Sequence, residues 1–265
     1  MLTFGLTGFT RFIKKYLYSM SDGQEVPVAG RLTDALPSTV WTWSIHPTYD
    51  QMAQHAAALI IAAAATAIAR RGAFRFVAAG GETPRRIYNL IAASPSMDWR
   101  AWHVYLSDER CVPDGSEFRN STMLEMEFLN RVCIPESQVH FIPAELGATA
   151  AAQAYRREVE VVESLDLVLL GLGEDGHIAS LFPRSTACGS LVVPVVDSPK
   201  PPAERVSLAP GMLKRSRGVL LVVSGATKRS ALKGIRVPDS LFQSVIGVGT
   251  NVTVLADSDA AADDF

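Results

Sequence analysis

The sequence has no excess of either charge. It contains 25 lysine and arginine residues against 27 aspartate and glutamate residues, which gives a net charge of -2 and an isoelectric point near 6.2. A chain without an overall positive field does not attract nucleic acid or an anionic membrane surface. We therefore expect neither of these as a partner.

Cysteine is scarce too. Cys111, Cys133 and Cys188 are far apart and form no C-x-x-C pair. An odd number of cysteines at such spacing argues against a disulfide framework and against a zinc site. The pattern is typical of reduced thiols, so we predict a cytoplasmic protein.

Hydrophobic runs are short for a membrane protein. The apolar, uncharged segment Ala56 to Ala69 has 14 residues, whereas about 20 are needed to span a bilayer. It predicts a buried helix. Near the start of the chain, Arg11, Lys14 and Lys15 do not precede an apolar core as they would in a secretory signal.

Strand-like and helix-like segments alternate from about Trp41 onward. This pattern predicts an α/β fold with a doubly wound, mostly parallel sheet and helices on both faces; a small subdomain built from the later strands is compatible with it. Composition favours a flexible amino-terminal extension over 1–40, one α/β domain over 41–257 and an acidic tail over 258–265. The expected helices are Tyr49–Arg71, Pro84–Ala93, Thr122–Arg131, Ala148–Ser164 and Ala226–Lys233.

In such sheets, ligands bind beyond the carboxyl ends of the strands. One predicted strand, "FRFVAA", is followed there by "GGETP". Gly80 and Gly81 permit close backbone approach, and Thr83 is suited to cap a helix whose first residue is Pro84. Free N–H groups at a helix start bind phosphate, although a plain tight turn would look the same.

Charged residues follow further along. "DERCVP" places Asp108 and Arg110 at the end of the predicted strand "HVYLS", where they form either an anion clamp with a proton acceptor or a surface ion pair. "SPKPP" carries Lys200, and Arg205 follows five residues later. These two cations would complete an anion site, although a solvated loop lysine is the more common case.

The segment "DLVLLGLGEDGHIASLFP" has the G-x-G-x-x-G spacing of a dinucleotide-binding turn. Two facts exclude that interpretation. Glu174 and Asp175 occupy the turn in which a negative pyrophosphate would lie, so like charges would meet. Pro183 also follows too soon for a long helix to develop. The glycines therefore indicate a tight turn.

The same turn carries a pair suited to acid/base catalysis. Asp175 and His177 flank a glycine, and a carboxylate beside an imidazole orients the ring and holds its charge. A histidine that only hydrogen-bonds a loop is the alternative. Of the five histidines, His177 alone has this glycine-rich, acidic setting, and we therefore select it as the catalytic residue.

Five segments in this order, "GGETP", "SDERCVP", "IPESQVHFIP", "DLVLLGLGEDGHIASLFP" and "SPKPPAERVSL", resemble the 6-phosphogluconolactonases of the pentose phosphate pathway. The resemblance covers roughly residues 41–257. It implies a hydrolase with an α/β fold that opens 6-phospho-D-glucono-1,5-lactone to 6-phosphogluconate without metal or cofactor.

The resemblance also implies residue roles. His177 and Asp175 match the family's catalytic pair, and Gly80, Gly81 and Thr83 match its sugar-phosphate loop. Its strand-end arginine and proline-flanked lysine correspond to Arg110 and Lys200. Three positions depart from the family pattern: Glu82 replaces a serine, Ile178 replaces a threonine, and Asn120 matches only approximately.

Two alternatives are weaker. Ile178 makes "DGHIA" similar to glucosamine-6-phosphate deaminases, but that family has a glutamate where Phe182 stands here, and an aromatic ring cannot relay protons. A sugar-phosphate sensor attached to a DNA-binding module would need a pair of short helices joined by a glycine turn, and residues 1–48 do not predict one.

Overall fold

The computed structural model describes residues 18–21, 24–27, 39–95, 97–183 and 189–261. The chain divides into two units, Met1–Pro37 and Ser38–Phe265. In the first unit, strands β1 (Tyr18–Ser21) and β2 (Gln24–Pro27) form an antiparallel hairpin. A hairpin thus lies within the segment predicted as a flexible extension. The rest of the fold concerns the second unit alone.

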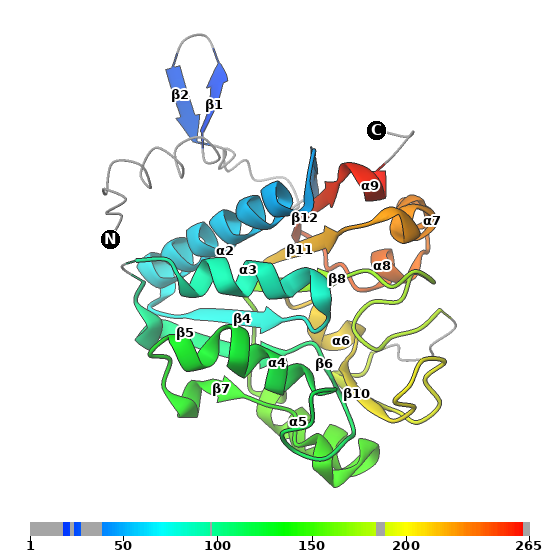
Figure 1. Cartoon of the computed structure of the whole chain (residues 1–265). Coiled ribbons are helices and arrows are strands. Elements are labelled where there is room, and N and C mark those ends of the chain that lie inside the picture. Colours follow the sequence, from blue (N-terminus) through cyan, green and yellow to red (C-terminus); the bar gives the residue numbers. More distant parts are fainter. Residues whose placement is uncertain (1–17, 22–23, 28–38, 96, 184–188, 262–265) are drawn as a thin grey trace. The chain divides into compact units, whose positions relative to one another are not determined.

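A seven-stranded parallel sheet forms the centre of the second unit (Figure 1), and its strand order is β3-β12-β11-β8-β4-β5-β7. Its strands are β3 (Val40–His46), β4 (Phe74–Ala78), β5 (Trp102–Leu106), β7 (Val139–His140), β8 (Leu167–Gly171), β11 (Gly218–Val223) and β12 (Asn251–Asp257). The order reverses direction as the chain proceeds, as the prediction of a doubly wound α/β sheet requires.

A small antiparallel sheet accompanies the large one, with the order β6-β10-β9. Its strands are β6 (Asp108–Arg110), β9 (Val192–Val195) and β10 (Arg205–Leu208). The prediction that later strands form a small substructure is correct for β9 and β10. Strand β6 was not predicted, because a three-residue strand inside a charged segment carries no hydrophobic alternation.

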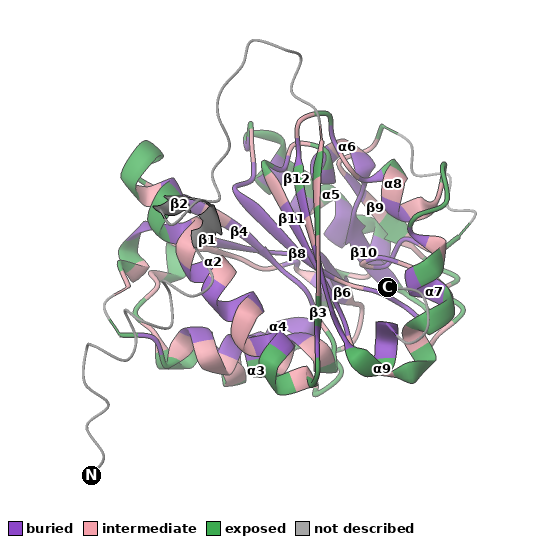
Figure 2. Ribbon diagram, turned by 90° about the horizontal axis from the view of Figure 1, so that it is seen from above, coloured by how far each residue is buried: buried purple, intermediate pink, exposed green. Residues whose placement is uncertain are grey.

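Helices cover both faces of the parallel sheet. Figure 2 shows α2, α3 and α4 on one side, and α6 with β9 and β10 on the other. The helices are α2 (Tyr49–Arg71), α3 (Glu82–Ala92), α4 (Asn120–Glu127), α5 (Ala148–Glu160), α6 (Pro210–Leu213), α7 (Arg229–Gly234), α8 (Leu241–Ser244) and α9 (Ser258–Ala261). Short 3₁₀ segments are Trp99–Ala101, Leu129–Arg131, Glu136–Gln138, Ala144–Leu146 and Ala226–Lys228.

Helix α2 has the predicted bounds. The Thr48 hydroxyl accepts a hydrogen bond from the Gln51 N–H at its start, and Gly72, with φ 75°, ends it. By length and composition alone α2 is long and apolar enough to cross a membrane. It packs, however, against α3 and strands of the sheet, with Met52 and Ile60 fully buried. This is the packing of a core helix.

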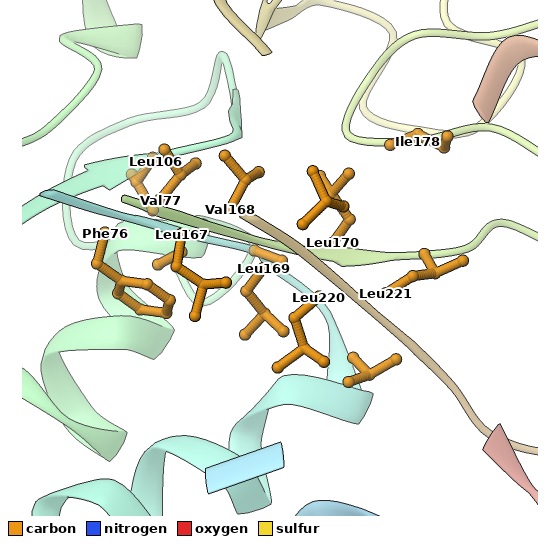
Figure 3. Packing of buried hydrophobic residues seen from close by; sticks show 14 of the residues in the cluster. Phe76, Val77, Leu106, Leu167, Val168, Leu169, Leu170, Ile178, Leu220 and Leu221 are labelled. Carbon is orange, nitrogen blue, oxygen red and sulfur yellow. The ribbon is translucent and has the colours of Figure 1, made fainter. Parts of the chain in front are cut away.

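The core centres on β8 and β11, which are buried on both faces and read as continuous apolar runs. Leu169 and Leu220 are at most 1% exposed, and burial of each such side chain stabilises the fold by about 1.5–3 kcal/mol. Ile178, from the turn after β8, is also fully buried, and it belongs to the same cluster (Figure 3). The core therefore holds one end of the segment that carries His177.

Near the carboxyl terminus, the segment assigned to an acidic tail begins with helix α9, whose Ala260 and Ala261 are buried. The Asp257 carboxylate accepts hydrogen bonds from the Ala260 and Gly225 N–H groups. The α/β unit thus includes at least these residues beyond 257.

Candidate active site

A pocket of about 430 Å³ lies at the carboxyl ends of β4, β5, β8 and β11. This is the edge of the parallel sheet at which the sequence analysis expected a ligand. Seven of the nine selected residues line it: Gly80, Gly81, Thr83, Asp108, Arg110, His177 and Arg205. Asp175 and Lys200 are not among the lining residues, but Asp175 contacts His177.

The Asp175 and His177 side chains are in contact. The distance from His177 Nδ1 to Asp175 Oδ1 is 2.5 Å. Burial raises the pKa of Asp175, but the hydrogen bond with His177 and the charge of that ring outweigh burial and leave the pKa below its ordinary value. An ionised Asp175 fixes the proton on Nδ1, which leaves Nε2 as the ring nitrogen available to the pocket.

A glycine turn places the imidazole there. The Gly173 N–H donates to the His177 carbonyl at 2.8 Å, and the Gly176 N–H donates to the Gly173 carbonyl at 3.0 Å. Gly176 has φ 84°, which favours glycine. A Cβ atom at Gly173 would overlap the His177 ring. No helix follows in the described residues up to Pro183. This agrees with the prediction that the glycines form a tight turn and not a dinucleotide-binding turn.

The glycine-rich loop after β4 leads directly into helix α3. Gly81 adopts φ 94°, and Gly80 lies against the Asn120 side chain so closely that a Cβ atom there would overlap it. The prediction that Thr83 caps a helix beginning at Pro84 is wrong. The helix begins at Glu82 with Gly81 at the cap position and no side-chain cap, because glycine reaches this conformation without a Cβ clash.

The early start changes how Glu82 is placed. Its carboxylate pairs with Arg85 at 3.1 Å, and its side chain is 86% exposed. The first turn of α3 still directs the positive end of the helix dipole toward the pocket that Gly80, Gly81 and Thr83 line.

Strand β6 brings two arginines together. Arg110 pairs with Arg205 in the antiparallel register of β6 and β10. Arg110 donates to the Phe118 carbonyl through Nη1 at 2.7 Å. Its buried Nε has no hydrogen-bond partner among the described residues. A buried, unpaired donor in a pocket lined by cations is suited to an anionic ligand.

The interpretation of "DER" as a surface ion pair is wrong, because Asp108 is buried and Glu109, between it and Arg110, is fully buried. Its carboxylate accepts the N–H groups of Arg110, Asn120 and Ser121. Burial raises the pKa of Glu109, although these hydrogen bonds oppose the rise. Glu109 thus fixes the start of α4 and the position of Arg110. The sequence gives only one signal for it, a carboxylate between two charged neighbours.

Lys228, which was not predicted, lines the pocket from the 3₁₀ segment after β11. The pKa of Lys228 lies below its ordinary value, mainly because of burial and also because of the charge of Lys200. The carboxylates of Glu174 and Asp175 oppose this lowering. Lys200 belongs to a loop beside the pocket, because its carbonyl accepts a hydrogen bond from Nη2 of the pocket-lining Arg205 at 2.9 Å. The rule that ligands bind beyond strand carboxyl ends, applied to "GVLLVVSGATK", would have found Lys228.

The other four histidines form two pairs outside the pocket. His55 Nδ1 lies 3.0 Å from His46 Nε2, and His103 Nδ1 lies 3.4 Å from His140 Nε2. Burial lowers the pKa of all four, that of His55 to about 4. His177 is the histidine that the fold places in the pocket.

A second cavity, of about 600 Å³, lies on the other side of the turn that carries Asp175. Its described lining includes Glu174, Asp175 and Asp239 but no histidine or basic side chain. We assign the site to the smaller pocket, because the smaller one contains His177 and the cations. Across the described part of the chain, no three His, Cys, Asp or Glu side chains converge as metal ligands would.

Residues 47–245 match the family model described as glucosamine-6-phosphate isomerases/6-phosphogluconolactonase, and the chain belongs to this family. A 6-phosphogluconolactonase of Mycobacterium bovis is 35% identical over 237 residues, which cover 82% of this chain and 96% of that protein. The chloroplastic 6-phosphogluconolactonase 3 of Arabidopsis thaliana is 37% identical over 182 residues, which cover 62% of this chain but only 56% of the relative.

A solved structure supports the same placement. The crystal structure of a 6-phosphogluconolactonase from Thermotoga maritima is 29% identical and superposes with a TM-score of 0.73. The superposition covers 83% of this chain and all of that one.

Proposed function

We propose that this chain hydrolyses 6-phospho-D-glucono-1,5-lactone to 6-phosphogluconate in the oxidative pentose phosphate pathway, with His177 as acid/base and with neither metal nor cofactor. The observation that carries the proposal is the contact between Asp175 and His177 at the wall of a pocket that is lined by arginine, lysine and a helix start.

His177 Nε2 takes a proton from water as the water oxygen attacks C1 of the lactone. The carbonyl oxygen becomes an oxyanion, and the bond from C1 to the ring oxygen then breaks. The imidazolium returns the proton to that ring oxygen, which becomes a hydroxyl. Asp175 holds the ring in the required tautomer and stabilises its positive form.

The phosphate is bound by Gly80, Gly81 and Thr83 at the start of α3. Lys228, in the pocket wall, and the nearby Lys200 add positive charge. The buried Nε of Arg110 donates either to the phosphate or to the oxyanion. A lactone is an activated ester, so this set needs no serine nucleophile.

Phe182 argues against the deaminase alternative, because the deaminases have a glutamate at this position. The Phe182 ring lies 4.8 Å from the His177 ring, centroid to centroid. A ring there cannot serve as the acid of a proton relay. For the cell, we propose a cytoplasmic location, since the described cysteines Cys111 and Cys133 are free thiols.

The test is lactone hydrolysis with 6-phosphogluconolactone generated in place and the spontaneous rate subtracted. We expect a rate far above the blank and no release of ammonia from glucosamine 6-phosphate. Hydrolysis equal to the blank, or ammonia release, contradicts the proposal.

A further inference from the structure

Ser180 lies three residues after His177 and is 1% exposed. Its hydroxyl donates to Asp108 Oδ2 at 2.7 Å, and its N–H donates to the Ser207 hydroxyl at 3.2 Å. Because Ser180 donates hydrogen bonds to residues of both β6 and β10, it connects the turn after β8 to the small sheet.

The backbone between His177 and Ser180 is held in an unfavourable conformation. Ala179 has φ 52°, a value that alanine rarely adopts. Ile178 and Leu181 exchange backbone hydrogen bonds at 3.1 and 2.9 Å, and both side chains are fully buried. Such a conformation persists only where its surroundings fix it, and Ser180 supplies that anchor on the side of the pocket.

Both carboxylate oxygens of Asp108 accept hydrogen bonds from serines inside the protein. Its Oδ1 accepts from the Ser107 hydroxyl at 2.8 Å, its Oδ2 accepts from Ser180, and the residue is 6% exposed. A buried carboxylate that accepts two serine hydroxyls holds those serines in place.

The Arg205 guanidinium also donates hydrogen bonds inside the protein. Its Nε donates to the Pro202 carbonyl at 3.1 Å, and Nη2 donates to the Lys200 carbonyl at 2.9 Å. Nη1 lies 3.5 Å from the Ser180 hydroxyl, and the guanidinium carbon lies 5.8 Å from the centre of the Phe182 ring, which in turn packs on His177. Arg205 therefore joins the lysine loop to the histidine turn.

We propose that Ser180, held by Asp108 and Arg205, is the positioning residue for His177, and that Asp108 and Arg205 act through this buried network rather than as substrate ligands. The inference goes beyond the proposed function, on which it rests for its kinetic test. It reassigns two residues that sequence reasoning placed in the binding set.

The kinetic test is a double-mutant cycle of Ser180→Ala and Asp108→Asn, measured with 6-phosphogluconolactone and with unphosphorylated glucono-1,5-lactone. Thr250→Val is the matched control, because it also removes a buried hydroxyl, which donates to the Ser216 carbonyl at 2.9 Å. Thr250 directly precedes β12 and so lies at the amino ends of the parallel strands, away from the pocket.

We expect each single variant to lower kcat about tenfold or more, by the same factor on both lactones, with little change in KM. The double variant should lose no more than the worse single variant, because both changes break one link. Thr250→Val should keep kcat, and its loss should multiply with that of Ser180→Ala.

Three kinetic results overturn the inference: normal kcat in Ser180→Ala, a loss in Asp108→Asn confined to KM for the phosphorylated lactone, or multiplied losses in the double variant. Should Ser180→Ala fail to fold, Ser207→Ala removes the other anchor of the same residue, and the same expectations hold.

A readout without turnover separates this inference from the proposed function. The imidazole resonances of His177, followed by NMR, should move in Ser180→Ala and stay unchanged in Thr250→Val. Unchanged resonances in Ser180→Ala overturn the inference even if the chain hydrolyses the lactone. A wild-type chain that hydrolyses neither lactone contradicts the proposed function alone.

Discussion

The Asp175 side chain is 37% exposed, yet its contact with His177 keeps the carboxyl group acidic. The charge matters for the proposed chemistry, because a neutral acid at this position could not stabilise the imidazolium that forms when His177 accepts a proton.

Asp175→Asn should therefore change how stability depends on pH. The folded-state pKa of Asp175 is lowered, so the contribution of the pair to stability is present above the ordinary value of 3.8 and is lost as pH falls through the lower folded value. The wild type should melt at a higher temperature than Asp175→Asn at neutral pH, and the difference should shrink in acid. Thermal unfolding over a pH series checks this. A difference that grows in acid contradicts the pairing.

The cations should act on binding rather than on chemistry. Lys200→Ala and Lys228→Ala should each raise KM for the phosphorylated lactone about tenfold or more, since a charge-assisted contact contributes roughly 1.5–3 kcal/mol. The penalty should shrink for glucono-1,5-lactone, which has no phosphate. Steady-state kinetics on both lactones measures it. Equal losses on both substrates would remove these lysines from the phosphate site.

The glycines of the turn after β8 leave room for the His177 ring. Gly173→Ala should lower kcat by about 10-fold to 100-fold, because the added Cβ overlaps the His177 ring and forces it away from its position. Gly234→Ala is the control, since a Cβ atom there meets nothing within 4 Å and its backbone has no positive φ. Wild-type kcat in Gly173→Ala, compared in one assay, contradicts this role of the turn.

The sequence predicted those helices and turns whose bounds are set by neighbouring residues. The bounds of α2 follow from Thr48, an apolar run and Gly72, and the turn at Asp175 and His177 follows from its glycines and from a strand that ends before it. The resemblance of ordered motifs then matched five of the residues that line the pocket, namely Gly80, Gly81, Thr83, Arg110 and His177. Asp108 and Arg205 were selected from their charge and their place in the sequence.

Long-range pairing could not be predicted in this way. Strand β6 exists because Asp108–Arg110 pairs with β10, almost a hundred positions later in the sequence. The same pairing buries Asp108 and Glu109 and turns them inward. A short charged segment gives no sign of which of its side chains will be buried, and Lys228 lay outside the motifs that were compared.

Across the fold, the parallel sheet gathers residues from four strand ends into one pocket, and the turn after β8 supplies its proposed catalytic pair. If acid/base catalysis by His177 suffices, EDTA should leave lactone hydrolysis intact, because the described residues offer no cluster of metal ligands. The rate before and after chelation, with the spontaneous rate subtracted, measures this. Loss of activity that a divalent ion restores would replace the metal-free mechanism.

The most direct measurement compares His177→Ala with the wild type in 6-phosphogluconolactone hydrolysis. The side chain is proposed to move the proton and not to bind the phosphate, so kcat should fall by about 10² to 10⁴ while KM stays within a few fold. A melting temperature close to that of the wild type shows that the variant is folded. Near-normal kcat in folded His177→Ala would contradict the account.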